Sequence, residues 1–188
     1  MSKTSALVSF CADLRSRLPT SHDSAALDAL DADLVIHLRT AEARPQKAHV
    51  GANNRAADLD RGGTELWNLC TKLRRELDGS RDKLEGVAGK RKTLLARCRY
   101  FAFLLIDIAR RSAGREKGVG GRDVVHLIRL ALKAGRGSIE CGELGVSLGA
   151  LQRAAEYIEG IKGSGDADVD GEVMKLEVEY FVLRTVQV

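Results

Sequence analysis

Residues 94–109 are the segment that most constrains the fold of this chain, and they hold three of its seven Phe and Tyr residues. Residues at three- and four-residue steps make one apolar helix face: Leu94, Cys98, Phe101, Ala102, Leu105, Ile108 and Ala109. A second face is also apolar: Tyr100, Phe103, Leu104 and Ile106. A helix that is apolar nearly all round is buried on more than one side, so other helices should pack around it. Arg97, Arg99 and Asp107 interrupt the stretch, which is also shorter than the about 20 apolar residues that cross a membrane.

Helical periodicity recurs along the rest of the chain and predicts an all-α fold of about seven helices. The expected helices cover residues 5–18, 25–41, 55–77, 81–112, 122–135, 143–161 and 172–186. Both prolines, Pro19 and Pro45, lie between these segments, and alternating apolar and polar runs are absent. Within this scheme Trp67 and Phe101 should fill the core between the third and fourth helices, and His37 should be a surface or half-buried packing residue.

The four cysteines are far apart in the sequence: Cys11, Cys70, Cys98 and Cys141. Three of them occupy apolar helix positions, which is typical of reduced, buried thiols in an intracellular protein and not of a disulfide framework or a zinc site. The first ten residues lack the apolar core of a secretion signal.

Charge is distributed unevenly along the chain. Residues 81–136 carry 15 basic and 5 acidic groups, a net charge of +10, whereas residues 137–188 carry a net −6. Such a basic block can bind nucleic acid, and eight cations could neutralise phosphates: Lys90, Arg91, Lys92, Arg97, Arg99, Arg110, Arg111 and Arg115. The alternative is a solvated helix surface beside a complementary acidic one, and we favour it because no aromatic or Gly-Arg pattern marks an RNA or DNA surface.

No arrangement of residues in the sequence indicates an enzyme. The four histidines are scattered: His22, His37, His49 and His126. Gly89-Lys90-Arg91 fails the phosphate-binding loop motif, because Leu84 stands where a glycine is required and Arg91 where Ser or Thr is required. The glycine-rich segment 113–121 follows no strand and should be a linker. We therefore expect no catalytic centre, cofactor, metal or small-molecule substrate.

Residues 122–161 read as a helix–turn–helix unit of about 40 residues, with its turn at Gly142-Glu143-Leu144. Small residues lie where the two helices should meet: Ala131, Ala134, Ala150, Ala154 and Ala155. The third and fourth expected helices make another pair, and the seventh would open a further unit. Helix pairs of this kind predict a right-handed α-solenoid of antiparallel pairs like those of tetratricopeptide (TPR) repeats.

Several segments resemble the N-terminal TPR region of a meiotic scaffold family, the "Zip four / Spo twenty-two" group with its testis-expressed animal relatives. They are Leu59-Asp60, Thr64-Glu65-Leu66-Trp67-Asn68-Leu69, the run from Arg99 to Ala109, Gly142-Glu143-Leu144, Arg153-Ala154-Ala155-Glu156-Tyr157 and the run from Glu179 to Thr185. The resemblance covers residues 55–188. It divides the chain into N-terminal helices and a loop (1–54) and a TPR-like repeat domain (55–188).

The resemblance implies a nuclear, chromosome-associated scaffold without a catalytic centre, acting in crossover formation and chromosome synapsis. Its partners would be other meiotic recombination and synaptonemal-complex proteins, with chromatin or DNA association and no membrane. Members of that family are several times longer, so the chain is expected to be the start of a longer solenoid. The Tyr180/Phe181 face of its last helix is then expected to be exposed or paired with another copy.

Overall fold

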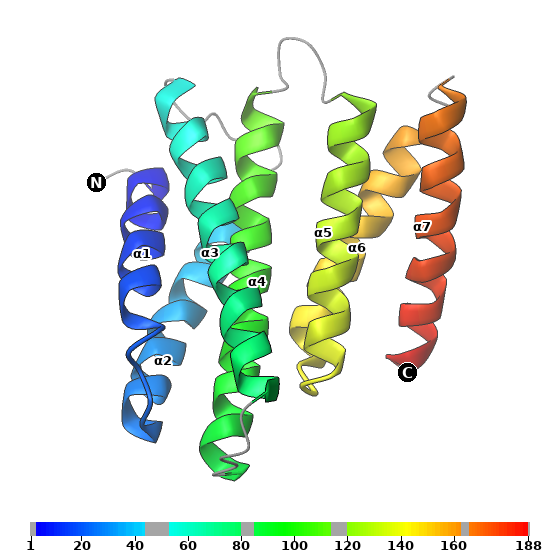
Figure 1. Cartoon of the computed structure of the whole chain (residues 1–188). Helices are drawn as coiled ribbons and strands as arrows, with labels where there is room; N and C mark the ends of the chain where they lie inside the picture. Colours follow the sequence, from blue (N-terminus) through cyan, green and yellow to red (C-terminus); the bar gives the residue numbers. More distant parts are fainter. Residues whose placement is uncertain (1–2, 44–52, 80–84, 114–119, 163–165, 188) are drawn as a thin grey trace. The chain divides into compact units, whose positions relative to one another are not determined.

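The computed structural model describes residues 3–43, 53–79, 85–113, 120–162 and 166–187. In these residues the chain forms seven helices and no strand, which confirms the all-α class (Figure 1). The helices are α1 (Lys3–Arg17), α2 (Ser24–Glu42), α3 (Asn53–Gly79), α4 (Glu85–Ala113), α5 (Gly121–Ile139), α6 (Leu144–Ile161) and α7 (Ala167–Val186). No helix in the described part of the chain is long and apolar enough to cross a membrane.

Two helices extend beyond the expected bounds. Helix α5 continues through Gly135 to Ile139, because that glycine lies against α6, where a Cβ would be 3.1 Å from Leu151 Cδ2. Helix α7 begins at Ala167 and not near residue 172, because the Asp166 carboxylate caps it by accepting hydrogen bonds from the backbone N–H groups of Asp168 and Val169. The expected first turn of α4, residues 81–84, lies outside the described residues.

The chain forms two compact units, Met1–Ala113 and Gly114–Val188. Helices α1 and α2 belong to the first unit, because α1 packs on α3 and α2 packs on α4. This division differs from the one expected after residue 54, which would separate α1 and α2 from the helices that they contact.

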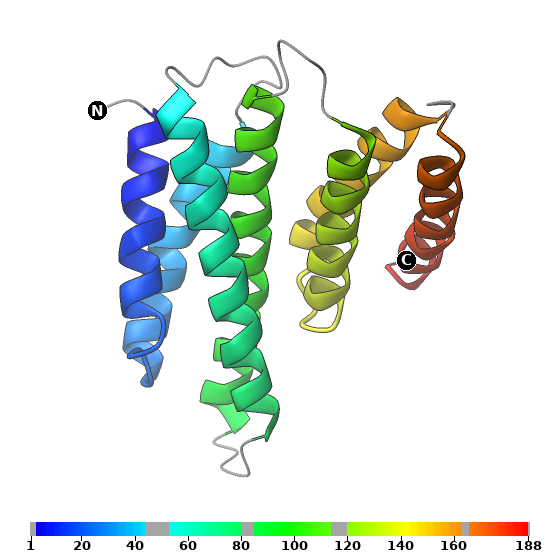
Figure 2. The same cartoon turned by 45° about the horizontal axis from the view of Figure 1, so that its top comes forward.

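The first unit consists of the four helices α1 to α4, which pack on one another. Helix α1 packs on α2 and α3, and α4 packs on α2 and α3. Figures 1 and 2 show α1 and α3 in one layer and α2 and α4 in the other. Helix α4 is buried continuously from Phe101 to Ala109, as its apolar faces predict.

Helices α3 and α4 approach each other closely at Gly63. A Cβ on this residue would stand 2.8 Å from the carbonyl oxygen of Ala102 and 2.8 Å from Ile106 Cγ1. In the sequence the pair Gly62-Gly63 reads as a weak point of the helix. In the structure Gly63 is the residue that lets the most apolar part of α4 reach the α3 backbone.

The second unit consists of α5, α6 and α7, each of which contacts the other two. Helices α5 and α6 meet through small residues, of which Ala131, Ala134, Ala150 and Ala154 are buried, as expected, and Ala155 is half-buried. The turn between them contains Gly142 with a φ of +73°, a conformation that favours glycine.

Candidate functional site

Seven of the eight candidate cations lie on α4, and the eighth, Arg115, lies outside the described residues. Arg99 stacks on Trp67, and the other six pair with polar side chains of the first unit: Lys90, Arg91, Lys92, Arg97, Arg110 and Arg111. Most of these partners are carboxylates, and they come from α2, from α3 and from α4 itself. The six cations therefore do not form one open basic surface. They divide into a group directed at α2 and a group directed at α3 or along α4.

The first group joins α4 to α2. Lys90 Nζ lies 2.7 Å from Asp28 Oδ2 and donates a hydrogen bond to Ser24 Oγ at 2.8 Å. The Arg97 guanidinium lies 2.5 Å from Asp31 Oδ2, and both side chains are about one-quarter to one-third exposed, at 24% and 32%. Lower exposure gives this pair less solvent screening than the Lys90–Asp28 pair, whose side chains are 47% and 61% exposed. Near the beginning of α4, Arg91 Nη1 lies 2.8 Å from the Nδ1 atom of His22, which precedes α2.

The second group joins α4 to α3 and stabilises α4 itself. Lys92 Nζ lies 3.0 Å from Asp78, and Arg110 Nε lies 3.2 Å from Asp60. Arg111 donates to Asp107 on the preceding turn at 2.7 Å, which satisfies a carboxylate that is only 3% exposed.

The pKa of Asp78 reflects its place between two cations. Partial burial acts to raise this pKa, but hydrogen bonds from Lys92 and Arg74 outweigh it, so the pKa of Asp78 is lowered. The carboxylate thus stays ionised and holds Lys92 at the junction of α3 and α4.

This pairing agrees with the interpretation of the basic block as a helix surface beside an acidic one. For the cations of α4, the carboxylates on other helices lie on α2 and α3, within the neutral first 80 residues of the sequence. Arg129 and Arg136, which belong to the same basic block, pair instead with Glu172 and Glu179 of the acidic C-terminal segment. The sequence could not show this, because each ion pair between two helices joins residues that are remote in the chain.

Trp67 and Phe101 occupy different environments. Phe101 is fully buried, with its ring centroid 5.6 Å from that of Phe10, as the core interpretation predicts. Trp67 is only half-buried, and the Arg99 guanidinium covers its ring at 4.5 Å from the centroid. Trp67 therefore lies at the edge of the core under a cation and does not fill it.

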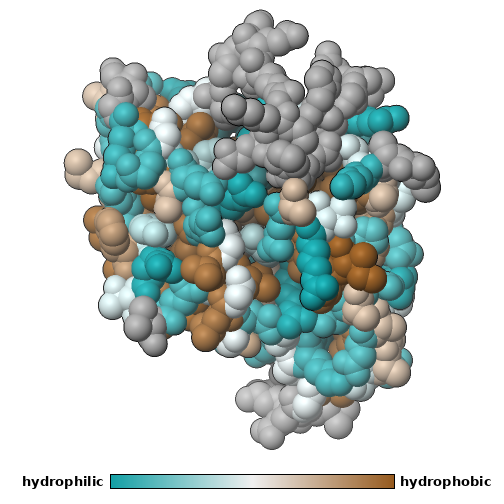
Figure 3. All heavy atoms as spheres, turned by 180° about the vertical axis from the view of Figure 1, so that it is seen from behind, coloured by the Kyte–Doolittle hydropathy of each residue, from teal (hydrophilic) through white to brown (hydrophobic). Residues whose placement is uncertain are grey.

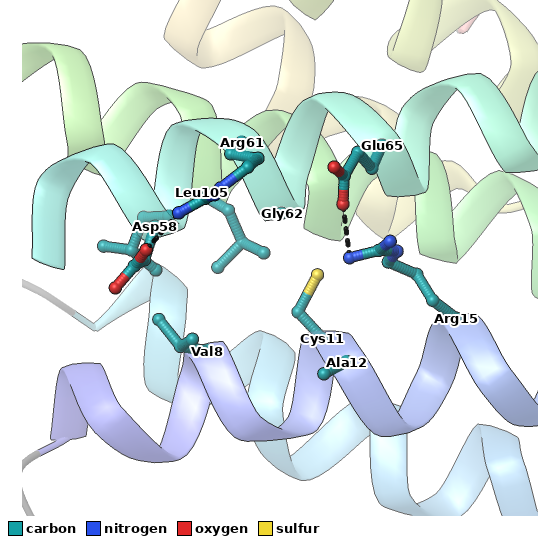
Figure 4. Close-up of a pocket in the computed structure, with 10 residues that line it drawn as sticks. Val8, Cys11, Ala12, Arg15, Asp58, Arg61, Gly62, Glu65 and Leu105 are labelled. Carbon is teal, nitrogen blue, oxygen red and sulfur yellow. Dashed lines mark hydrogen bonds and ion pairs between the residues drawn. The ribbon is translucent and has the colours of Figure 1, made fainter.

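A cavity of about 210 Å³ lies between α1 and α3 (Figure 4). Its wall includes Cys11, whose thiol faces Gly62, and Arg15, which forms an ion pair with Glu65 at 2.5 Å. Burial raises the pKa of the Cys11 thiol to about 12, despite the opposing effect of Arg15. The thiol stays protonated near neutral pH, so the cavity lacks an activated nucleophile.

The prediction of buried thiols is confirmed for three of the four cysteines. Cys11, Cys70 and Cys98 are buried and form no disulfide, whereas Cys141 is half-buried. Burial is the main cause that raises the pKa of Cys98, and a hydrogen bond with Cys70 adds to it. The described residues include no group of three or more His, Cys, Asp or Glu side chains able to hold a metal ion.

Three of the four histidines fall within the described residues, and they lie on separate elements. His22 precedes α2, His37 lies on α2 and His126 lies on α5. His37 is half-buried, as expected, and stacks on Phe10 with ring centroids 3.9 Å apart. Desolvation lowers the pKa of His37, and the nearby Asp33 carboxylate only partly opposes this. His37 is thus a packing residue of the α1–α2 contact.

Helix α7 carries an apolar face that the described residues of the second unit leave exposed. Five of its large apolar side chains are more than half exposed: Met174, Val178, Phe181, Val182 and Val186. We call these five residues the outer stripe. Figure 3 shows that brown, hydrophobic residues interrupt the teal surface on the face that it displays. The exposed position of Phe181 matches one of the two outcomes expected for the Tyr180/Phe181 face.

Sequence reasoning identified only the Tyr180/Phe181 part of this surface. Met174, Val178 and Val182 were missed, although their spacing is a signal for them. Val178 lies four residues after Met174 and three before Phe181, and Val182 lies eight residues after Met174, so all share one side of the helix. The inner residues of α7, Val173 and Leu176, follow the same periodicity on another face, so the two faces obscure each other.

Searches against protein families, curated proteins and solved structures found no match to this chain.

Proposed function

We propose that the protein is a non-enzymatic interaction scaffold made of stacked helix pairs. The resemblance described above suggests that it acts in the nucleus, on chromosomes, with other proteins of meiotic recombination, crossover formation and synapsis. Stacked helix pairs of a TPR-like α-solenoid present a groove that receives a helix or an extended segment of a partner.

The observation that carries this proposal is the direction of alternate helices. In the second unit, Arg129 pairs with Glu172 at 2.7 Å and Arg136 with Glu179 at 2.8 Å. Both pairs join α5 to α7 with the same separation of 43 residues, so these two helices run parallel. Alternate helices that run parallel, with an antiparallel helix between them, are the repeating arrangement of helical-repeat proteins.

The first unit has the same arrangement. Asp28 and Asp31 on α2 pair with Lys90 and Arg97 on α4 in the same order along both helices, so α2 and α4 are parallel. The paired residues of α2 and α4 are 62 and 66 positions apart in the sequence, whereas those of α5 and α7 are 43 positions apart. These separations differ from the 34-residue period of TPR units.

A second candidate function is nucleic-acid binding through residues 81–136, which the net charge of +10 favours. The ion pairs of Lys90, Lys92, Arg97 and Arg110 argue against it. A phosphate would have to displace a carboxylate at each of these cations, and the net gain from each contact would be small. We therefore place the scaffold role first.

The experiment that separates these functions is DNA binding across a salt series, combined with affinity capture from nuclear extracts of meiotic cells. One variant reverses the charges of Lys90, Arg91 and Lys92. The control reverses Arg39, Arg75 and Lys175, three exposed cations outside residues 81–136, and so changes the net charge equally.

The scaffold role predicts weak DNA binding at physiological salt and specific capture of recombination or synapsis proteins from meiotic but not somatic nuclei. Tight DNA binding with a steep salt dependence, flattened by the α4 variant and not by the control, would establish the nucleic-acid function in its place. Specific capture of unrelated proteins from both kinds of nuclei would retain a scaffold and reject the meiotic role.

A further inference from the structure

We propose that the outer stripe of α7 is a self-association surface, on which a second copy of the chain docks its own α7 in the antiparallel direction. This inference goes beyond the scaffold role and does not depend on the meiotic assignment. It rests on the spacing of the exposed residues, on the preformed helix that carries them, and on the charges beside them.

The spacing is that of a helix-pairing seam. Gly171, Met174, Val178, Phe181 and Thr185 follow one another at steps of three, four, three and four residues, and all five are exposed. A repeat of three and four residues keeps one narrow line of side chains facing a partner helix. Val182 and Val186 lie at the edge of this seam and widen its apolar area.

The helix is already formed and held in place by its other face. Val169, Val173, Leu176 and Leu183 are buried against the second unit, and Asp166 caps the first turn. A partner therefore binds a rigid surface about 30 Å long, given about 1.5 Å of rise for each of the 20 residues. Docking therefore carries no free-energy cost for forming the helix, and this cost is the main obstacle to the pairing of short isolated helices.

The charges beside the seam select the antiparallel direction. With a two-fold axis that crosses the helices between Glu179 and Tyr180, Val178 of each copy packs on Phe181 of the other, and Met174 packs on Thr185. The same register places Glu177 of each copy beside Arg184 of the other, so that two ion pairs flank the seam symmetrically.

Both of these flanking residues can reach a partner. Arg184 is exposed and at present donates to Gln187 at 3.1 Å. Glu177 pairs with Lys162 at 2.9 Å, and its side chain is 27% exposed. The alkyl stem of Lys175, also exposed, lies opposite Val182 of the second copy and can cover it. Antiparallel docking also opposes the helix dipoles favourably.

The size of the stripe sets the expected strength. Five side chains on one helix form a smaller contact than the roughly 800 Å² per partner of a standard interface, so we expect a dissociation constant of about 1–100 µM.

The test is sedimentation of the full chain at protein concentrations from below to above the expected dissociation constant, with three comparisons. Phe181→Asp introduces charge into the centre of the seam. Ile36→Asp is the matched control, because Ile36 on α2 is an equally exposed apolar residue, at 63% against 58% for Phe181.

The third comparison uses Glu177→Arg, Arg184→Glu and the double variant that exchanges the two charges. We expect the wild type and Ile36→Asp to dimerise, Phe181→Asp to raise the dissociation constant by about 100-fold, and the double variant to recover the affinity that each single charge change loses. Circular dichroism should show unchanged helix content for all variants, since each substituted side chain is at least partly exposed.

A chain that stays monomeric throughout this range, or a dimer that Phe181→Asp leaves intact, would overturn the proposal. A dimer that fails to recover in the double variant would overturn the antiparallel register. The scaffold role is tested separately, because the monomeric Phe181→Asp variant should still capture partners through the grooves of the helix pairs. Loss of capture without loss of dimerisation would contradict only the proposed function.

Discussion

Helices α4 and α7 have the same sequence character and different surroundings. Each carries apolar residues on two faces, so a single partner helix cannot cover all of them. Helix α4 is enclosed from Phe101 to Ala109, because α2 and α3 pack on it from two sides. Helix α7 contacts α5 and α6 through one face only, and the other face, including Phe181, is exposed.

The difference shows that the number of apolar faces on a helix predicts how many contacts it can make, and not whether they occur within the same unit. The polar residues beside the apolar faces follow the same rule. Around α4 the cations pair with carboxylates of α2 and α3. On α7, Glu179 pairs with Arg136 of α5, whereas Arg184 donates a hydrogen bond to the neighbouring Gln187.

The largest expected effect tests this comparison directly, with one Phe on each helix. Phe101→Ala should lower the free energy of unfolding by about 3–5 kcal/mol, because it removes a fully buried ring from the first unit. Phe181→Ala should change it by less than about 0.5 kcal/mol in the monomer, because that side chain is already in water. Urea unfolding at protein concentrations below the dimer range measures both, and similar losses for the two variants would refute the contrast.

A smaller effect on stability is expected for substitution of two glycines, the buried Gly63 of α3 and the exposed Gly171 of α7. Gly63→Ala should destabilise the first unit by about 1–3 kcal/mol, because its Cβ would collide with the Ala102 carbonyl and with Ile106. Gly171→Ala is the matched change on the exposed face of α7, where nothing lies within 4 Å of the added atom. It should stabilise the helix by about 0.5–1 kcal/mol, as expected for Gly→Ala in an open helical position. Thermal unfolding of the two variants should therefore shift in opposite directions, and a stabilising Gly63→Ala would contradict the close contact of α3 with α4.

The smallest effect is a pH dependence confined to the first unit. Burial lowers the pKa of His37 below its ordinary 6.5, so the folded protein binds this proton less readily than the unfolded chain. The contribution to stability is complete above pH 6.5 and is lost as the pH falls through the lowered pKa. We expect a fraction of a kcal/mol, since the ring is only half-buried.

NMR titration of the His37 ring should give a midpoint below 6.5. The acid-dependent loss of stability should be smaller in His37→Gln than in the wild type, because that variant has no proton to take up at this site. A midpoint above 6.5 would contradict the stacking of His37 on Phe10 in the α1–α2 contact.

The helices and most of the core were predictable, because helical periodicity is a local property of the sequence. The faces that contain Leu34, Leu73 and Phe101 are buried as their spacing indicates. The exceptions were residues whose role depends on a neighbour. Gly63 and Gly135 resembled interruptions in the sequence, whereas in the structure they allow close contact with α4 and α6.

The candidate site was predictable only in part. The sequence identified the cations Lys90, Arg97 and Arg110 as a basic block, and it could not show that Asp28, Asp31 and Asp60 lie beside them. Trp67 was expected in the core because of its size, yet its position at the edge of α3 leaves its ring half-buried beneath Arg99.

Local sequence specifies that this chain is helical, where most of its helices lie, and that α4 needs contacts on more than one side, because side chains three or four residues apart share a helix face. The tertiary structure decided which of those faces are covered and which charges are neutralised. These outcomes depend on packing between residues 40 to 70 positions apart, such as Arg136 with Glu179 and Arg97 with Asp31. Local spacing carries no information on such distant partners, so the covered α4 and the exposed α7 could be distinguished only in the folded chain.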